Sequence, residues 1–210
     1  MSDREHWDAN YAEGFLPWDT GVPDPLLVEL IEGGSVPVGR ALEVGCGTGT
    51  NAVWLATKRF EVVALDLAPR AVAMAQARAA ATGVRVDLRA ADFLNDPLDL
   101  APFDFVFDRG CFHVFDAAAD QDRFAARVAG LLAPGGRWLS IIGSTEGAAR
   151  DVGPPRRSLR DVAAAVEPHL EIVEIRRIAL DPDPTHPVAW LLLAGVRTAP
   201  AQPSTRRSAG

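Results

Sequence analysis

A glycine-rich turn near residue 45 is the part of the chain whose residue types offer the clearest chemistry. Residues 41–50 read Ala-Leu-Glu-Val-Gly-Cys-Gly-Thr-Gly-Thr, so an apolar run enters the turn with Glu43 two residues before Gly45. Glycine permits positive φ angles and lets the backbone approach a ligand that a Cβ atom would exclude. A turn of this kind between a strand and a helix binds nucleotide-type ligands. We therefore predict a nucleotide-type site here, with a ligand-free glycine turn as the alternative.

Two common nucleotide motifs do not fit this turn. Counted from Gly45, the dinucleotide pattern G-x-G-x-x-G requires glycine at position 50, where the chain has Thr50. The phosphate-binding Walker loop requires a Gly-Lys-Ser/Thr ending, which is absent from this stretch of sequence. The turn is therefore typical of neither a dinucleotide nor a nucleoside-triphosphate site.

A second acid, Asp66, ends the apolar run that starts at Phe60, about 20 residues after the glycine turn. In doubly wound folds an acid at the tip of the second strand accepts hydrogen bonds from ribose hydroxyls. Leu67-Ala-Pro69 then opens a helix with proline in its first turn. The alternative is that Asp66 only caps this helix.

The pattern E-x-G-C-G-T-G from Glu43 to Gly49 resembles the cofactor loop of class I S-adenosylmethionine-dependent methyltransferases. The resemblance implies S-adenosylmethionine as the cofactor. In this superfamily adenine binds where the third strand ends, with an acid for its amine (Asp92) and an apolar face for its ring (Phe93). The cofactor-binding residues implied in the loop and at the strand ends are Glu43, Gly45, Cys46, Gly47, Thr48, Gly49, Asp66, Leu67, Asp92, Phe93 and Asp108.

The N-terminal region narrows the resemblance. W-x3-Y at Trp7 and Tyr11, followed by P-W-D-x-G-x-x-x-P over residues 17–25, resembles the branch that contains plant thiol/halide methyltransferases and thiopurine S-methyltransferase. In that branch an N-terminal segment, here about residues 1–35, folds over the cofactor as a lid. The resemblance implies that Trp7 and Trp18 contact the cofactor and that Tyr11, Phe15 and Trp18 line the acceptor side. The alternative is that these aromatic residues belong to the core.

Asp108-Arg109-Gly110 follows a fourth predicted strand and resembles the D-R-G of thiopurine methyltransferases, whose arginine lies beside the acceptor. Arg109 could therefore bind a thiolate or an acidic substrate, or it could pair with an acid such as Asp19. His113 is the candidate catalytic base and a substrate-side residue, with a packed or capping histidine as the alternative. The resemblance covers roughly residues 5–145, and residues 147–187 give no family-specific match.

The predicted reaction is an in-line displacement of an activated methyl group, which depends mainly on positioning in a dry pocket. We predict a small acceptor nucleophile, a thiol, thiopurine, chalcogen or halide, none of which needs a base near neutral pH. N- or O-methylation of a small heterocyclic or phenolic compound is the alternative, and it would gain from a base. A hypothesis of a different functional class is a cofactor-binding methyltransferase-like module that acts through a protein partner.

Composition limits the remaining choices. The net charge of −7 over 210 residues and a pI of about 5.1 lack the basic surface that nucleic acid requires. No apolar run approaches roughly 18 residues, and the start of the chain is charged, so we predict neither a signal peptide nor a membrane span. Two cysteines do not form a disulfide framework, which favours a cytoplasmic protein. No metal-ligand spacing is present, and a monomer is the expected state.

Strand and helix patterns alternate along the chain, which predicts a doubly wound α/β fold with a seven-stranded, mostly parallel sheet and an antiparallel last strand. We expect one domain over residues 1–197 and a disordered tail over 198–210. The predicted strands are 40–45, 61–66, 84–90, 103–108, 136–142, 170–178 and 188–196; the predicted helices are 50–58, 69–82, 118–132 and 158–167, after N-terminal helical segments near 6–11 and 25–31.

Overall fold

A computed structural model describes residues 2–14, 16–100, 102–148, 153–180 and 187–197. Phe15, residues 149–152 and 181–186 of the region without a family match, and the predicted tail at 198–210 therefore lie outside the described residues. No helix within the described ranges is long and apolar enough to cross a membrane.

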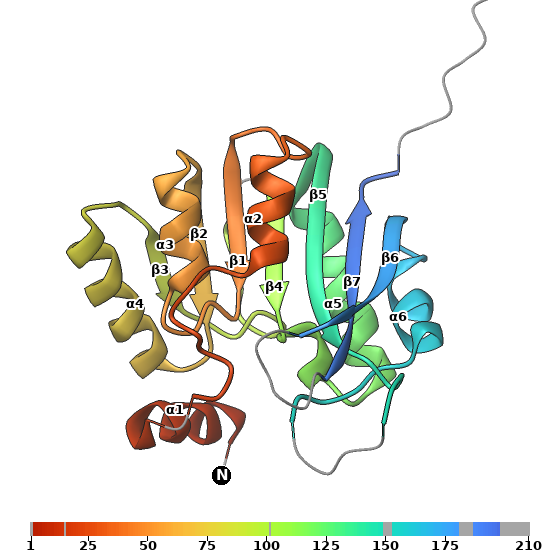
Figure 1. The fold of residues 1–210 in the computed structure, drawn as a ribbon, viewed down its shortest axis with the longest axis horizontal. Coiled ribbons are helices and arrows are strands. Elements are labelled where there is room, and N and C mark those ends of the chain that lie inside the picture. The colour runs from red at the N-terminus through yellow and green to blue at the C-terminus, as the bar shows by residue number, and fades with distance from the viewer. Residues whose placement is uncertain (1, 15, 101, 149–152, 181–186, 198–210) are drawn as a thin grey trace, which may run out of the picture.

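Seven strands form one sheet in the order β3-β2-β1-β4-β5-β7-β6 (Figure 1). The strands β1 to β5 are parallel neighbours, while β7 runs antiparallel to both β5 and β6. This confirms the predicted mostly parallel sheet with an antiparallel last strand. The strands are β1 (Arg40–Val44), β2 (Glu61–Asp66), β3 (Asp87–Ala90), β4 (Phe103–Arg109), β5 (Leu132–Gly143), β6 (Glu171–Ala179) and β7 (Val188–Gly195).

Helices cover both faces of the sheet. They are α1 (Asp3–Glu13), α2 (Pro25–Glu32), α3 (Thr50–Thr57), α4 (Pro69–Thr82), α5 (Ala118–Leu131) and α6 (Leu159–Val166), with a 3-10 turn η1 (Phe112–Val114) after β4. Side chains of α2 and α3 pack on one face and those of α5 and α6 on the other. Alternate residues of β2 serve the two cores, Val62 and Ala64 one and Val63 and Leu65 the other, as the two-residue period of a strand requires.

The predicted boundaries fail in two places, for local reasons. The third strand begins at Asp87 instead of residue 84, because Gly83 is left-handed and Val84 N donates to Ala79 O, which ends α4. The fifth strand begins at Leu132, where the backbone is already extended, and not at residue 136. A capping box begins α6: Ser158 Oγ accepts from Asp161 N, and Asp161 Oδ2 accepts from Ser158 N.

The helix α1 has no buried residue and lies beneath the carboxyl ends of the parallel strands (Figure 1). Its Asp8 carboxylate accepts two hydrogen bonds from Arg70, one from the backbone N at 2.8 Å and one from Nε at 3.0 Å. Arg70 is in the first turn of α4, where the helix dipole favours an acid. The N-terminal segment is therefore held to the sheet's ligand-binding edge by polar contacts.

Gly49 fixes how closely α3 approaches α4. Its φ is +80°, and a Cβ atom there would lie 2.7 Å from Ala75 Cβ. We expect Gly49→Ala to lower the free energy of unfolding by about 2–4 kcal/mol, from left-handed strain plus overpacking. Gly34→Ala is the matched control, because Gly34 has φ +71° and open space around it. Urea unfolding that gives equal losses for both variants would refute the packing argument.

Candidate active site

The predicted site residues come together because β2, β1 and β4 are adjacent parallel strands. Val44 pairs with Leu65 of β2 and with Asp108 of β4, so the three strands end side by side. The glycine turn follows β1 at this edge, Asp66 is the last residue of β2, and Arg109 is the last residue of β4. The crossing from β1 outward to β2 on one side and to β4 on the other marks the switch point at which open α/β sheets bind ligands.

The glycine turn is shaped by its neighbours. Gly45 N and Cys46 N both donate to Leu65 O, at 2.8 and 2.9 Å. A Cβ atom at Gly45 would lie 3.0 Å from Cys111 Cβ, and one at Gly47 would lie 3.2 Å from the Tyr11 hydroxyl. Both glycines have positive φ, 71° and 54°. Close approach and backbone geometry therefore both require glycine here.

Asp66 joins the end of β2 to the glycine turn. Gly47 N donates to its Oδ2 at 2.8 Å, and Ala68 N donates to its Oδ1 at 2.9 Å. Burial raises the pKa of Asp66, and these backbone hydrogen bonds oppose that shift. Asp66 thus caps the start of α4, as the alternative interpretation expected, and it also contacts the glycine turn. Each of its oxygens keeps a lone pair for a further donor.

Glu43 is a buried carboxylate at the end of β1, with 1% of its surface exposed. Asn51 Nδ2 donates to its Oε1 at 3.2 Å, whereas Oε2 has no hydrogen-bond partner among the described residues. Burial raises the pKa of Glu43 from its ordinary 4.5 to about 8. The site therefore contains one buried carboxyl oxygen whose hydrogen bonding a ligand could satisfy.

Asp19 docks the N-terminal loop onto the glycine turn. Thr48 Oγ1 donates to Asp19 Oδ2 at 2.6 Å, and Thr50 Oγ1 donates to Asp19 Oδ1 at 3.3 Å. Arg78 of α4 completes this group, because its Nε donates to Thr48 O and its Nη2 to Thr48 Oγ1. The Thr48 hydroxyl is therefore bonded to protein groups, and the cofactor-binding role of Thr48 stays a prediction.

Arg109 pairs with Asp24 and not with Asp19. Its Nε donates to Asp24 Oδ2 at 2.7 Å, and its Nη1 donates to Trp18 O at 3.2 Å. Asp24 N in turn donates to Asn51 Oδ1 at 2.8 Å. With the bond from Asn51 to Glu43, this makes a continuous polar chain from the end of β1 to the N-terminal loop and the end of β4.

The aromatic residues of the N-terminal segment form one cluster. Trp7 and Trp18 meet edge to face with ring centroids 5.6 Å apart, and Tyr11 and Trp18 do so at 6.2 Å. All three are half-buried. Burial, followed by the charge of Asp66, raises the pKa of Tyr11, so its hydroxyl stays protonated. Through Tyr11, whose hydroxyl lies beside Gly47, the cluster is next to the glycine turn, and its contact with the cofactor stays a prediction.

Two acids and one aromatic ring at the later strand ends have partners within the protein. Asp92 Oδ1 accepts from Leu94 N and Asn95 N. The Phe93 ring is buried, with its centroid 4.7 Å from that of Phe124, so it packs in the core, and its contact with adenine stays a prediction. Asp108 is fully buried and accepts from Cys111 N, Phe112 N and Trp138 Nε1, and its contact with the cofactor stays a prediction.

His113 is buried and its ring contacts two backbone segments. Gly143 N donates to His113 Nδ1 at 2.8 Å. In a neutral ring whose Nδ1 accepts, the proton is on Nε2, so this tautomer offers a donor where a base must offer an acceptor. The geometry therefore favours the packed histidine over the catalytic base.

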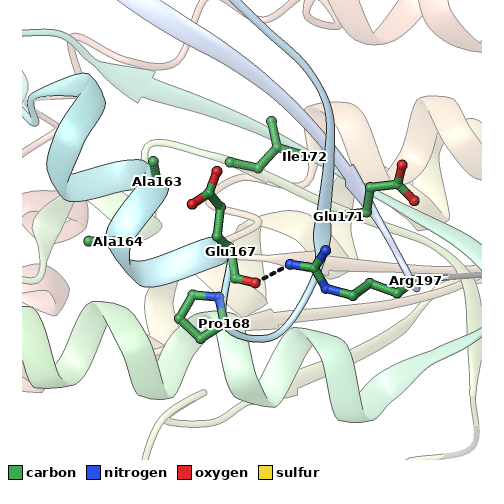
Figure 2. Close-up of a pocket in the computed structure, with 7 residues that line it drawn as sticks. All are labelled: Ala163, Ala164, Glu167, Pro168, Glu171, Ile172 and Arg197. Carbon is green, nitrogen blue, oxygen red and sulfur yellow. Dashed lines mark hydrogen bonds between the residues drawn. The ribbon is translucent and has the colours of Figure 1, made fainter.

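Surface hollows lie away from the glycine turn. One of about 630 Å³ is bounded by α6 and the start of β6, where Arg197 donates to Glu167 O (Figure 2). Another of about 740 Å³ lies between α4 and the starts of β1, β2 and β3. Neither includes a residue of the glycine turn, so neither is the site predicted from sequence.

Sequence reasoning missed Asn51, Arg78 and Asp24. Asn51 and Arg78 belong to no recognised motif. Asn51 is the second residue of α3 and Arg78 is in the third turn of α4, and both helices begin at the site. Asp24 precedes Pro25, a recognisable helix N-cap signal, and its Oδ1 does accept from Leu26 N.

Comparison with known proteins agrees with the site. Residues 41–136 match a family described as "Methyltransferase domain". A probable thiol methyltransferase 2 of Arabidopsis thaliana is 33% identical over 152 residues, 71% of this chain and 65% of the relative. A 2-heptyl-1-hydroxyquinolin-4(1H)-one methyltransferase of Mycobacteroides abscessus is 31% identical over 127 residues, 60% and 55% of the two chains. The chain thus spans less than two-thirds of the length of these relatives.

One similar solved structure comes from work on the conversion of a disulfide bond into a thioacetal group during echinomycin biosynthesis. It superposes on this chain with a TM-score of 0.80. It is 26% identical, and the match covers 91% of each chain. Fold and site together define a doubly wound α/β protein with a nucleotide-type site at the ends of β1, β2 and β4. The chain belongs to the class I S-adenosylmethionine-dependent methyltransferases.

The described residues fit S-adenosylmethionine, the cofactor of this family. The turn has glycines where a Cβ atom would meet Cys111 and Tyr11, and Asp66 keeps lone pairs at the tip of β2. Glu43 Oε2, which has no partner among the described residues, is a buried carboxyl oxygen at the base of the same turn. A cofactor with hydroxyl and ammonium donors complements these acceptors.

Asp66→Ala is expected to weaken S-adenosylhomocysteine binding by about 1–3 kcal/mol, or roughly 5- to 150-fold in Kd, through lost charge-assisted hydrogen bonds. Calorimetric titration measures the effect. Asp87→Ala serves as the control, since Asp87 is the first residue of β3, where its carboxylate accepts from Arg89. Unchanged affinity in Asp66→Ala would remove the ribose assignment.

Glu43→Gln is expected to remove most of the pH dependence of stability between about pH 6.5 and 8.5. The raised pKa means that the folded chain keeps a proton that the unfolded chain has released, so stability falls as pH rises toward the folded pKa. For the cofactor-free wild type we expect the free energy of unfolding to fall by about 2 kcal/mol over this window, and urea unfolding at each pH measures it. Asp108, whose pKa burial raises to about 6, titrates largely below it. A Glu43→Gln variant that keeps the full slope would contradict the assignment.

Proposed function

We propose that the chain methylates a small soft or anionic nucleophile, a thiol, thiopurine, chalcogen or halide, with S-adenosylmethionine as donor. When bound, the cofactor supplies an activated sulfonium methyl group. The chain's residues then need to hold the acceptor in line with that methyl and to exclude water. The thiol methyltransferase named among the relatives supports this class of acceptor.

The observation that carries the proposal is the hydrogen bond from Gly143 N to His113 Nδ1. It directs the histidine toward the tautomer that donates, so the crevice segment after β4 offers no ready imidazole base. A thiolate or halide requires none, because it arrives with its lone pair available. Phenols and neutral azoles lose a proton during transfer and would gain from a base.

The N-terminal segment of about residues 1–35 is proposed to act as the lid over the cofactor and acceptor. Its Asp19 and Asp24 contacts to Thr48 and Arg109 support this role, as does the aromatic cluster over Gly47. Trp7, Tyr11 and Trp18 would then wall the acceptor side. A small-molecule acceptor, a cytoplasmic setting and a single domain remain part of this proposal, and the two free cysteines are compatible with the reducing setting.

N- or O-methylation of a small heterocycle is the second candidate function. The hydroxyquinolone methyltransferase among the relatives favours it. It would require His113 to switch tautomer or another residue to accept the proton.

The test is release of S-adenosylhomocysteine across a thiol, a thiopurine, iodide, tellurite and a hydroxylated azaheterocycle, with wild type and His113→Asn. Asn Oδ1 can replace Nδ1 as the acceptor for Gly143 N, so this variant removes the imidazole without removing that bond. We expect sulfur or halide turnover within about threefold of wild type in His113→Asn. His113→Ala, which leaves the Gly143 N–H unpaired, should lose about 1–3 kcal/mol of stability.

Turnover of the azaheterocycle alone, lost in a His113→Asn protein with unchanged melting temperature, would favour the second candidate. Cofactor binding without any turnover, in an assay that contains no protein partner, would favour the third hypothesis, a module that acts through another protein. Failure to bind the cofactor would end all three.

A further inference from the structure

The backbone of Arg157 is fixed beside the carboxyl end of β5. Arg157 N donates to Gly143 O at 2.7 Å, and Thr145 N and Trp190 Nε1 both donate to Arg157 O, at 3.1 and 3.0 Å. Gly143 is the residue whose N–H reaches His113. Arg157 therefore belongs to the acceptor side of the switch point, one strand beyond Arg109, although no motif pointed to it.

The Arg157 side chain is largely buried, with 12% of its surface exposed. Its Nη2 donates to Asp116 Oδ1 at 2.7 Å and its Nη1 to Arg156 O at 3.3 Å. Its Nε is buried and has no hydrogen-bond partner among the described residues. A buried guanidinium N–H without an acceptor is costly, so this edge of Arg157 is suited to a further acceptor.

The contact with Asp116 satisfies only half of that edge. A guanidinium binds a carboxylate side-on through Nε and Nη2 together, but Asp116 engages Nη2 alone. The Asp116 side chain is 92% exposed, and exposed ion pairs contribute little net free energy. An anionic group that reached both N–H groups could therefore replace Asp116 at little cost.

Arg109 and Arg156 already have other partners, which leaves Arg157 as the candidate for binding an anion. Arg109 is engaged by the buried Asp24 carboxylate, whose side chain is 4% exposed. Arg156 donates to the carbonyl oxygens of Ser144, Thr145 and Glu146 and thereby holds the loop after β5. Its positive charge remains beside Arg157 and adds to the attraction for an anion.

We propose that Arg157 is an anion subsite for the methyl acceptor and that the preferred acceptors are thiols carrying a carboxylate. This rests on the proposed methyl transfer to a small nucleophile and names the substrate class for it. The acceptor carboxylate binds Arg157 through Nε and Nη2 and displaces Asp116, while its thiol sulfur is left to meet the methyl group. The thiolate then forms the new S–C bond as the sulfonium S–C bond breaks, and the thiol proton is lost to solvent.

The first experiment compares two thiols of similar size, 2-mercaptoacetate and neutral 2-mercaptoethanol, in steady-state kinetics with saturating cofactor. Arg157→Gln should raise KM for mercaptoacetate about 10- to 100-fold and change KM for mercaptoethanol less than twofold. Asp116→Ala should lower KM for mercaptoacetate, because it removes the competing carboxylate. Arg160→Gln, at an exposed arginine of α6, is the control and should change neither.

A purely structural Arg157–Asp116 clamp gives a different result. It predicts that Arg157→Gln and Asp116→Ala both raise KM for the two thiols alike and both lower the melting temperature. That pattern would overturn the subsite.

The second experiment separates the subsite from the reaction. (Methylthio)acetate and 2-(methylthio)ethanol, the two products, are titrated calorimetrically into protein loaded with S-adenosylhomocysteine. A preference for the carboxylate that disappears in Arg157→Gln supports the subsite even if neither thiol is methylated, in which case the proposed function fails alone. Equal affinity for the two products, or no binding of either, would overturn the subsite.

Discussion

Glu43, a carboxylate buried at the end of β1, is the constraint on which the site depends. Burial of a carboxyl group is costly, and its side-chain partner among the described residues is the neutral amide of Asn51. Because Asn51 also accepts from Asp24 N, and Asp24 binds Arg109, the acid determines where the start of α2 lies relative to β4. One residue of the sheet thus positions the N-terminal segment that covers the cofactor turn.

Acids at successive strand ends act in a common way. Asp66, Asp92 and Asp108 each accept backbone N–H groups from the turn that follows β2, β3 and β4. Such bonds fix loops that would otherwise expose unpaired donors. The acids therefore shape the site even where they do not touch a ligand, which explains why the same residue types fitted both the functional and the structural interpretations.

The chemistry of methyl transfer is consistent with this construction. The reactive group comes with the cofactor, so the protein contributes position and the exclusion of water more than acid–base catalysis. A histidine whose Nδ1 is already bonded to Gly143, a Tyr11 hydroxyl that stays protonated and a Thr48 hydroxyl that donates to Asp19 give a site of fixed contacts without a ready base. Such a site suits acceptors that bring their own nucleophilic lone pair.

The sequence by itself determined the sheet, the glycine turn, Asp66 and the family, because strand and helix periodicity, glycine spacing and helix signals are local properties of the chain. It also determined that Trp7, Tyr11 and Trp18 belong to one segment. Only the tertiary structure decided the partners: that Arg109 binds Asp24 and not Asp19, that Phe93 enters the core, and that Arg157 meets His113 at Gly143. These contacts join residues dozens of positions apart, and no local pattern specifies which of several suitable side chains packing will bring together.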